Sequence, residues 1–421
     1  MKVLVLNRFK LARVDYRRWA HPSDELYLIT SSDSVSADET ARKKELAGFA
    51  HTEVVDDFAD SAMPEYLAHR LHGRHSFGKL LAMSEFDLLR AGRLRDAWGV
   101  SGQSAAEALL FRDKIRMKEL LAESGVPITG YRAVDNVTDL LLAVRELGFP
   151  LVVKPRLGAA SVGVTVVEND ADLDAFLVHN PLSVGDAPAH LMAESFVSHA
   201  LFHIDGIVDA GEVKVCRPSE QTTSCLEITQ GAVCLSTFLD ADDPRLRTLQ
   251  DMTVRAVEAL GIEETALFHA EIFGSPDGFV FNEVGCRVGG AKIRDQLEYG
   301  FDVDPIEWFA RAYLGNPRHH DLRSEPVRQT GYALVPPRPG LVESLGEVEL
   351  PSSIRLFESK IGPGDVLERS TSSTSASSTS AMASFVSVGA TQADVVRDLD
   401  AAVAALRSVL VVRELPAETD R

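Results

Sequence analysis

A predicted β-hairpin that carries two glutamates has the clearest potential for chemistry in this sequence. Residues 268–295 read FHAEIFGSPDGFVFNEVGCRVGGAKIRD. Strands are expected at Phe268–Phe273 and Phe279–Val284, joined by Gly-Ser-Pro-Asp-Gly. Proline presets one dihedral angle and glycine accepts positive φ, so this turn between apolar runs favours a tight hairpin.

Glu271 and Glu283 lie one on each predicted strand. Strict alternation gives each glutamate two neighbours on its own face: His269 and Phe273 for Glu271, and Phe279 and Phe281 for Glu283. If the two faces coincide, the carboxylates are neighbours in an otherwise apolar hairpin, where they would repel. A divalent cation removes this repulsion, and hard oxygen ligands favour Mg²⁺ or Mn²⁺ completed by phosphates. The alternative is a surface hairpin with solvated glutamates.

An anion-binding pattern follows this hairpin directly. Arg287 offers a planar fork of donors for a carboxylate or phosphate, and Gly289-Gly290 lets the backbone approach a ligand closely. The hairpin and its exit therefore indicate a metal next to an anion.

A glycine-rich loop earlier in the chain is a second candidate for phosphate binding. The predicted strand Leu151–Pro155 delivers Lys154, and a second strand is expected at Val164–Glu168. The loop between them contains Gly158, Ser161 and Gly163. Nucleotide-binding P-loops and Rossmann loops run from strand into helix. Because this loop joins strand to strand, it predicts a hairpin flap with exposed backbone N–H groups, with an ordinary hairpin tip as the alternative.

The elements around these residues predict an α/β protein with three regions. The first region alternates short apolar strands (Lys2–Asn7, Leu26–Thr30, Glu53–Asp57) with helices (Ala37–Phe49, Met63–Arg70, Ser84–Trp98), which is typical of an open α/β domain. It carries no GxGxxG after its first strand, so a dinucleotide site has little support. We place its end near Gly102.

The second region begins with one long amphipathic helix expected over Ser104–Ser124, which carries Lys114. Further helices are expected at Asn136–Leu147, Asp170–His179, Arg245–Leu260, Lys292–Tyr299 and Pro305–Leu314, and strands at Tyr131–Val134, Leu201–Val208, Glu212–Val215 and Ala232–Phe238. Ala193–Val197 is a short apolar segment with one acid.

The third region reads as short strands (Gly331–Val335, Arg355–Glu358, Ala383–Val388) and a helix over Gln392–Leu410. Between them, Arg369–Ala381 is rich in Ser and Thr and predicts a mobile loop.

Composition excludes several classes of function. The chain has 421 residues, 45% of them apolar and 25% charged, with a formal net charge of −19. This acidity argues against nucleic acid or an anionic membrane as the main partner. The four cysteines show no CxxC spacing, and no leader or membrane-spanning run stands out, so a reducing cytoplasm is the expected compartment.

From Ser84 to Leu314 the order of these features resembles the ATP-grasp superfamily, specifically its carboxylate–amine ligases. The resemblance is carried by six features in order: Lys114 on the entering helix, Lys154-Pro155 at a strand end, the Gly/Ser hairpin loop, Glu-x-Phe-Val at Glu194–Val197, His-x-Glu at His269–Glu271, and Asn-Glu-x4-Arg-x-Gly-Gly at Asn282–Gly290. It implies the domain division 1–102, 103–316 with a flap subdomain at about 125–197, and 317–421 with a β-rich C-terminal subdomain.

The resemblance also implies residue roles. Lys114 and Lys154 would hold the phosphates of ATP, and the Gly158–Gly163 flap, with Ser161, would close over them. Glu194, Ser195, Phe196 and Val197 would form the adenine-binding linker. Glu271 and Glu283 would ligate Mg²⁺ or Mn²⁺. Arg287, with Gly289 and Gly290, would bind the substrate carboxylate or its acyl phosphate.

Two positions depart from the pattern of the superfamily. Leu201 stands where a glutamate commonly binds the ribose, so Asp205 or His203 is the candidate replacement. Glu283-Val284-Gly285 replaces the usual Glu-x-Asn, so one metal ligand is missing or comes from elsewhere.

The activity implied is an ATP-dependent ligase that forms an amide through an acyl phosphate, with small-molecule acid and amine substrates. Two alternatives stay open: transfer of the acyl phosphate to another acceptor, as in a carboxylase, and a nucleotide-binding protein without turnover. His203, His269 and Glu271 are candidates for the general base. Dimers are common in the superfamily, so a homodimer is one expected assembly.

Overall fold

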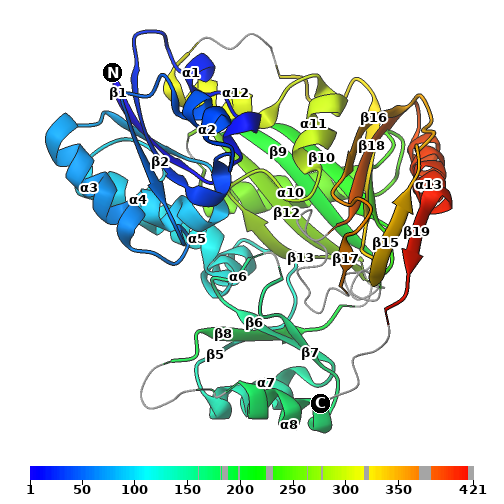
Figure 1. The fold of residues 1–421 in the computed structure, drawn as a ribbon. Coiled ribbons are helices and arrows are strands. Elements are labelled where there is room, and N and C mark those ends of the chain that lie inside the picture. Colours follow the sequence, from blue (N-terminus) through cyan, green and yellow to red (C-terminus); the bar gives the residue numbers. More distant parts are fainter. Residues whose placement is uncertain are drawn as a thin grey trace.

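The computed structural model describes residues 1–159, 161–180, 182, 188–197, 200–223, 231–262, 264–275, 278–316, 322–368 and 381–415. Figure 1 shows a first α/β unit, a small sheet with two helices, and a large central sheet between them. The Ser/Thr-rich run predicted as a mobile loop lies outside the described residues except for Ala381.

The first unit is a four-stranded parallel sheet in the order β3-β2-β1-β4. Its strands are β1 (Lys2–Asn7), β2 (Glu25–Ser31), β3 (His51–Val55) and β4 (Lys79–Ala82). Its helices are η1 (Leu11–Arg13), α1 (Tyr16–Trp19), η2 (Ser32–Ser34), α2 (Glu39–Leu46), α3 (Met63–His75), η3 (Glu85–Asp87) and α4 (Leu88–Trp98). The near-continuous apolar runs in β1 and β2 are buried on both faces, as parallel strands usually are.

A break at Asp113 corrects the prediction of one long helix over Ser104–Ser124. The structure has α5 (Ala105–Arg112) and α6 (Lys114–Glu123). Asp113 adopts an extended conformation, and its carboxylate caps α6 by accepting from the backbone N–H groups of Ile115 and Arg116. Because aspartate competes with the helix for its own backbone, it favours such a cap over a helix interior. The break places Lys114 at the first turn of α6.

The small sheet has the order β5-β8-β6-β7, with β5 (Tyr131–Val134), β6 (Leu151–Pro155), β7 (Thr165–Val167) and β8 (Leu191–Ser195). The helices α7 (Val137–Leu147) and α8 (Asp170–His179) cover the face that is turned away from the rest of the molecule (Figure 1). Phe281 N–H donates to Pro127 O at 2.8 Å, which attaches the entry to this sheet to the edge of the large one.

The large sheet has eight strands in the order β13-β12-β9-β10-β11-β14-β18-β16. Their bounds are β9 (Leu201–Asp209), β10 (Glu212–Gln221), β11 (Cys234–Phe238), β12 (Ala266–Ser275), β13 (Gly278–Gly285), β14 (Gln329–Val335), β16 (Ile354–Ser359) and β18 (Ala383–Gly389). The predicted strands of the third region therefore continue the same sheet as the glutamate hairpin. A separate small sheet pairs β15 (Gly340–Leu345) with β17 (Val366–Leu367) and β19 (Leu410–Arg413).

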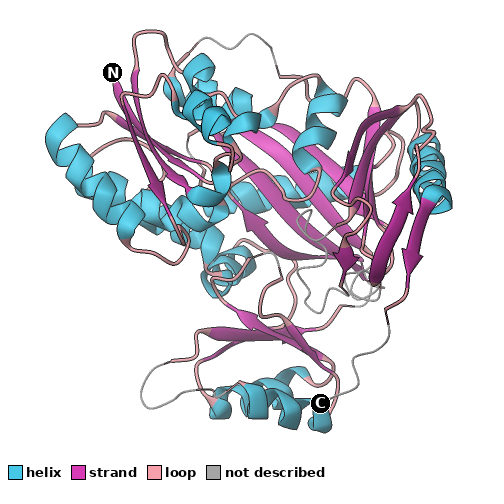
Figure 2. Ribbon diagram, in the orientation of Figure 1, coloured by secondary structure: helices cyan, strands magenta, loops and turns pink. Residues whose placement is uncertain are grey.

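Two hydrophobic cores lie on opposite faces of this sheet. On one face α5, α6 and α10 (Leu246–Leu260) pack against residues such as Phe268, Ala270 and Phe281. The other face packs at Ile207 and Leu267 against the first unit and against α11 (Ile293–Phe301) and α12 (Pro305–Leu314). The helix α13 (Gln392–Val409) covers the far end of the sheet, as Figure 2 shows. Among the described residues, no helix combines the length and apolar character needed to cross a bilayer.

Candidate active site

A β-bulge at Asn282 sets the geometry of the glutamate hairpin. Glu271 pairs with Glu283, whereas the next residue, Ile272, pairs with Phe281, so Asn282 is the extra residue. The prediction that Phe279, Phe281 and Glu283 share a face is therefore wrong, because the bulge shifts the alternation by one residue. Phe281 stays in the core with α6 and α10, and Glu283 lies directly opposite Glu271 on the other face.

Lys114 joins Glu283 to the glycine-rich flap. Its Nζ lies 3.1 Å from Oε2 of Glu283 and donates to the carbonyl of Gly158 at 2.7 Å. Burial by itself would raise the pKa of Glu283, but the charges of Lys114 and Lys154 outweigh it and lower this pKa to about 2. Glu283 is thus fully ionised at neutral pH.

A second lysine reaches the same place from the small sheet. Lys154 Nζ lies 2.5 Å from Glu194 Oε1 and donates to Asn282 Oδ1 at 3.4 Å. Lys118, one turn along α6 from Lys114, lies 3.3 Å from the other oxygen of Glu194 and donates to Thr129 Oγ1. Glu194 therefore holds two buried lysines between the two sheets, and their charges lower its pKa although burial opposes this.

The residues around Glu271 and Glu283 fit a Mg²⁺ or Mn²⁺ ion. Asn282 Nδ2 donates to Glu271 Oε2 at 2.9 Å, and the other oxygen of Glu271 faces Nε2 of His269 at 3.6 Å. Oε2 of Glu283 is buried and lies 3.1 Å from the ammonium group of Lys114, without a hydrogen bond of normal geometry. An ionised carboxylate opposite a second carboxylate is the donor set that hard cations prefer.

A buried aspartate connects two histidines beside this pair. Asp205 Oδ2 lies 2.6 Å from Nδ1 of His203, and its Oδ1 lies 2.8 Å from Nδ1 of His269. His269 Nε2 in turn lies 3.6 Å from Oε1 of Glu271. Burial would lower the pKa of His269, but Asp205 outweighs it and raises this pKa to about 9. His269 is therefore charged at neutral pH.

Position 289 packs against the Asp205–His269 pair and has room only for glycine. A side-chain Cβ at this position would lie 2.7 Å from His269 Nδ1 and 2.8 Å from Asp205 Oδ1. The predicted approach of the Gly289-Gly290 backbone to a ligand stays a prediction; in the structure the backbone of Gly289 lies against the Asp205–His269 pair. Gly290 is exposed.

Arg287 is held by a residue of the first unit. Its Nε donates to Glu85 Oε2 at 2.7 Å, and its Nη1 donates to Val288 O. Arg112 binds the other oxygen of Glu85 and also donates to the carbonyl of Leu157, at the start of the flap. One buried carboxylate therefore connects the first unit, the flap and Arg287.

The flap contains a tight turn, and backbone hydrogen bonds hold the start of the linker in place. Ser161 and Gly163 adopt positive φ (58° and 73°), and a Cβ at Gly163 would lie 3.0 Å from the ring of Pro155. Ser195 N–H donates to Gly130 O and Phe196 N–H to Pro150 O, so these bonds fix the exit from β8 next to the entries to β5 and β6.

The structure brings six of the predicted site residues into one network at the junction of the two sheets: Lys114, Lys154, Gly158, Glu194, Glu271 and Glu283. Two residues without a predicted role belong to it, Asn282 and Lys118, and a third, Glu85, holds Arg287 beside it. Asn282 stands in the Asn-Glu pair of the motif, and Lys118 follows Lys114 at helical spacing, so a signal for both was present. Glu85 carried no such signal, because its partners are distant in sequence.

Comparisons of the sequence with known proteins found two informative matches. Residues 119–290 match the ATP-grasp domain. The chain is 26% identical over 303 residues to an L-arginine-specific L-amino acid ligase from Bacillus subtilis, covering 71% of this chain and 72% of that protein.

Solved structures share the whole fold. An L-amino acid ligase from Bacillus licheniformis superposes with a TM-score of 0.72 at 15% identity over 99% of both chains. The biotin carboxylase domain dimer of a 2-oxoglutarate carboxylase from Hydrogenobacter thermophilus, solved with MgADP, ADP and bicarbonate, has a TM-score of 0.68 at 15% identity, covering 98% of this chain and 90% of that one.

Proposed function

Because residues 119–290 match the ATP-grasp domain, we propose that this chain joins a carboxylic acid to an amine at the expense of ATP, with an amino acid as one substrate. The observation that carries this proposal is the opposition of Glu271 and Glu283 beside Lys114 and Lys154. Two carboxylates facing two lysines suit a metal-bound triphosphate, because the metal and the lysines together match its charge.

The first step would transfer the γ-phosphoryl group of ATP to the substrate carboxylate. A carboxylate oxygen attacks the γ-phosphorus, the bond to the bridging oxygen breaks, and ADP leaves. Both reactants are anions, so the step depends on neutralising charge. We assign Lys114 and Lys154 to the phosphates and Arg287 to the substrate carboxylate. Mg²⁺ held by Glu271 and Glu283 would supply further charge neutralisation when bound.

The second step would form the amide. The amine attacks the acyl carbon, the carbon–oxygen bond to phosphate breaks, and phosphate leaves with its electron pair. Gly158, Ser161 and Gly163 belong to the flap that we propose closes over the phosphates and excludes water, which would otherwise hydrolyse the acyl phosphate. Lys114 donates to Gly158 O in the flap, and we assign the same side chain to the phosphates. A movement of the flap would therefore change the contact between Lys114 and the phosphates.

His269 fits anion binding better than proton abstraction. A histidine whose pKa is raised to about 9 is protonated at neutral pH, so it has no free lone pair for an incoming ammonium proton. We propose that His269 stabilises negative charge on the acyl phosphate, held in place by Asp205. We keep Glu194–Val197 as the adenine linker. Asp205, the candidate for the ribose, is buried with one carboxylate oxygen on His203 and the other on His269.

An amino acid is proposed as a substrate because the B. subtilis relative is named as an L-amino acid ligase specific for L-arginine. Transfer to bicarbonate is the second candidate, supported by the shared fold of the biotin carboxylase domain solved with bicarbonate. We also propose the cytoplasm as compartment and a homodimer as assembly, the latter because that carboxylase domain is described as a dimer.

The deciding experiment is phosphate release from Mg·ATP against a matrix of amino acids and small carboxylic acids, with mass spectrometry of the products. A product mass equal to acid plus amine minus water would establish the ligase and name both substrates. Phosphate release with bicarbonate alone and a carboxylated product would establish the second candidate. Nucleotide binding without turnover in any combination would contradict both.

A further inference from the structure

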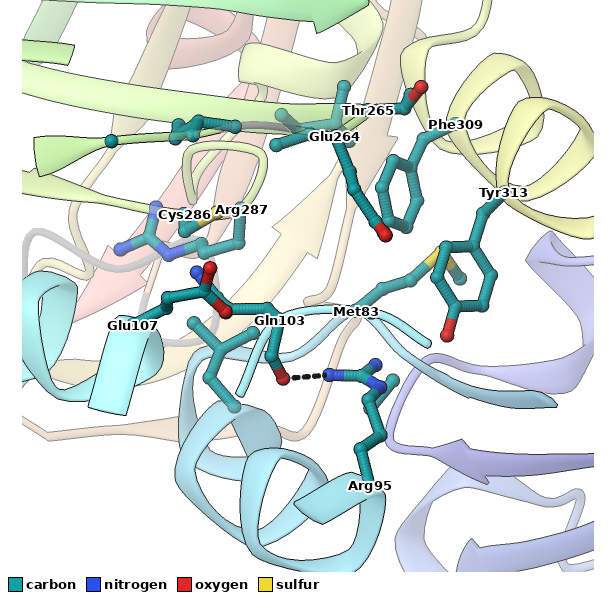
Figure 3. Close-up of a pocket in the computed structure, with 17 residues that line it drawn as sticks. Met83, Arg95, Gln103, Glu107, Glu264, Thr265, Cys286, Arg287, Phe309 and Tyr313 are labelled. Atoms are coloured by element: carbon teal, nitrogen blue, oxygen red, sulfur yellow. Dashed lines mark hydrogen bonds between the residues drawn. The ribbon is translucent and has the colours of Figure 1, made fainter. Parts of the chain in front are cut away.

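A cavity lies behind Arg287, between the first α/β unit and the start of β12. Its volume is about 120 Å³. Since a buried water needs roughly 10–15 Å³ on this scale, the cavity has room for a small molecule of several heavy atoms. Its walls come from the end of β4, from α4 and α5, from the loop before β12, and from α12 (Figure 3).

This cavity borders the proposed catalytic residues at Arg287. The side chain of Arg287 lines it, but in Figure 3 the guanidinium group of Arg287 points away from Phe309 and Tyr313 on the opposite wall. Nε of Arg287 binds Glu85 instead. None of Lys114, Lys154, Glu271 and Glu283 lines the cavity.

A buried arginine without a counterion lies in its wall. Five arginines are buried in the described part of the chain. Four of them have a carboxylate partner there: Arg90 with Asp87, Arg112 with Glu85, Arg217 with Glu325, and Arg311 with Glu307. Arg95 has none among the described residues. Its Nη1 and Nη2 donate to the carbonyls of Gln103 and Leu80, each at 2.9 Å, and its Nε has no hydrogen-bond partner.

The missing partner of Arg95 is the feature that points to a ligand. A buried guanidinium without an anion is unfavourable, because neutral carbonyls compensate only part of the lost hydration. The loop at Gly102 packs directly on Arg95, since a Cβ there would lie 2.8 Å from Nε. A small shift of this loop would open Nε to the cavity. A carboxylate is the anion whose geometry matches a guanidinium.

A carboxylate of the protein lies on the opposite side. Glu264 lines the cavity next to Phe309 and Tyr313 (Figure 3). It is exposed and forms no ion pair with another described residue. The walls also include the apolar side chains of Met83, Leu88, Ile262, Leu267 and Phe309 and the polar ones of Gln103, Glu107, Thr265 and Tyr313. The cavity thus offers a positive group, a negative group and apolar side chains in its wall, and the second carboxylate, Glu107, already accepts from the backbone N–H of Ser104.

We propose that this cavity is a second ligand site that binds a small aminocarboxylic acid, with its carboxylate on Arg95 and its ammonium group on Glu264. The site adjoins Cys286 and the side chain of Arg287, so its occupancy bears on the group that we assign to the substrate carboxylate. Binding there requires no turnover, so the test is independent of the proposed function.

The test is calorimetric titration of the full chain without ATP, using L-leucine, L-lysine and 5-aminovalerate one at a time. Two probes that lack one charge, 4-methylvalerate and isoamylamine, serve as ligand controls. We expect one of the three aminocarboxylic acids to bind in the millimolar range or tighter, and both single-charge probes to bind at least about tenfold more weakly. The α-amino and ω-amino probes identify the preferred spacing of the two charges.

Variants locate the binding. Glu264→Lys reverses an exposed charge and Ile262→Trp fills the cavity; each is expected to weaken binding about tenfold or more. Arg95→Met tests the cation, and the other two variants keep the proposal testable if this one does not fold. Glu347→Lys makes the same charge change at a distant exposed site, and Glu283→Gln alters the catalytic cleft; neither should affect binding.

Two results would overturn the proposal. One is the absence of heat for all three aminocarboxylic acids up to about 10 mM, well above the affinity expected for two charged contacts. The other is binding that Glu264→Lys and Ile262→Trp leave unchanged but Glu283→Gln removes, since that pattern places the ligand in the catalytic cleft.

Discussion

Glu85 holds Arg287 through an ion pair that crosses from the first α/β unit to the exit of the glutamate hairpin. The Nε of Arg287 donates to one oxygen of Glu85 at 2.7 Å, and Arg112 binds the other oxygen. Burial would raise the pKa of Glu85, but the two guanidinium groups outweigh it and keep this pKa below its ordinary value. Glu85 therefore stays ionised and fixes Arg287 while leaving Nη2 of Arg287 available for a substrate.

Glu85→Gln is expected to lower both stability and activity. The amide keeps the volume of glutamate but leaves the buried guanidinium group of Arg112 and the partly buried one of Arg287 without their counterion. Breaking a buried pair in this way costs about 3–5 kcal/mol. Urea denaturation should show this loss, and kinetics should show a higher KM for the acid substrate. Glu65→Gln, which removes a partly exposed pair with Arg93, should cost about 1 kcal/mol or less. Equal effects in both variants would contradict the role of Glu85.

Glu283→Gln should abolish turnover and leave the fold intact. The substitution removes an ionised metal ligand with almost no change in volume, and we expect kcat to fall by about a hundredfold or more. ADP release with Mg²⁺ measures the activity, and circular dichroism checks the fold. Glu347→Gln, at an exposed position, is the matched control. Near-normal activity of Glu283→Gln would refute the metal assignment.

Arg287→Lys keeps the positive charge of the side chain and removes the planar arrangement of N–H donors. Lysine keeps the positive charge but cannot donate to Glu85 and to a substrate carboxylate in one plane. We expect kcat/KM for the acid substrate to fall by about a hundredfold, with the KM for ATP little changed. Arg255→Lys on the exposed side of α10 should have no effect. A loss confined to the KM for ATP would place Arg287 at the nucleotide instead.

Most strands and helices follow from apolar periodicity and turn residues. The bounds of β1, β5, β6, α8 and α12 agree with the prediction residue for residue. These elements are bounded by clear signals such as Gly148-Phe-Pro150 before β6, where the chain has no other favourable conformation.

The elements that the sequence did not predict lack such signals. The strand β4 is a four-residue segment, KLLA, between a helix end and a turn, and it gains its stability from pairing with β1. The strands β15, β17 and β19 form a small sheet from segments far apart in the chain. Short pairings of this kind depend on tertiary contacts rather than on local propensity.

The candidate site was predictable in its residue types and less so in its geometry. The proximity of Glu271 and Glu283 was predicted on the condition that their faces coincide, but the cause is the bulge at Asn282. A bulge has no reliable local signal, since it depends on how two strands fit together. The pairing of Glu85 with Arg287 likewise spans 202 residues and requires the whole fold.

The Asp205–His269 pair makes the stability of the metal-free protein depend on pH. The pKa of His269 is raised from 6.5 to about 9 in the folded protein, because the opposing effect of burial is outweighed by Asp205. The folded state therefore binds a proton that the unfolded state has released. A histidine pKa that is higher in the folded state than in the unfolded state stabilises the folded protein. This stabilisation is complete below about pH 6.5 and is lost as the pH rises towards 9.

We expect the free energy of unfolding, measured by urea in EDTA, to fall by about 2 kcal/mol between pH 7 and 8.5, at 1.36 kcal/mol per pH unit. Asp205→Asn should lower the overall stability and flatten this slope, because it removes the charge that keeps His269 protonated. The partly exposed His51, replaced by Gln, should leave the slope unchanged. A flat profile in the unmodified protein, or an equal slope in Asp205→Asn, would show that His269 is neutral in the folded state and would reopen its role as a base.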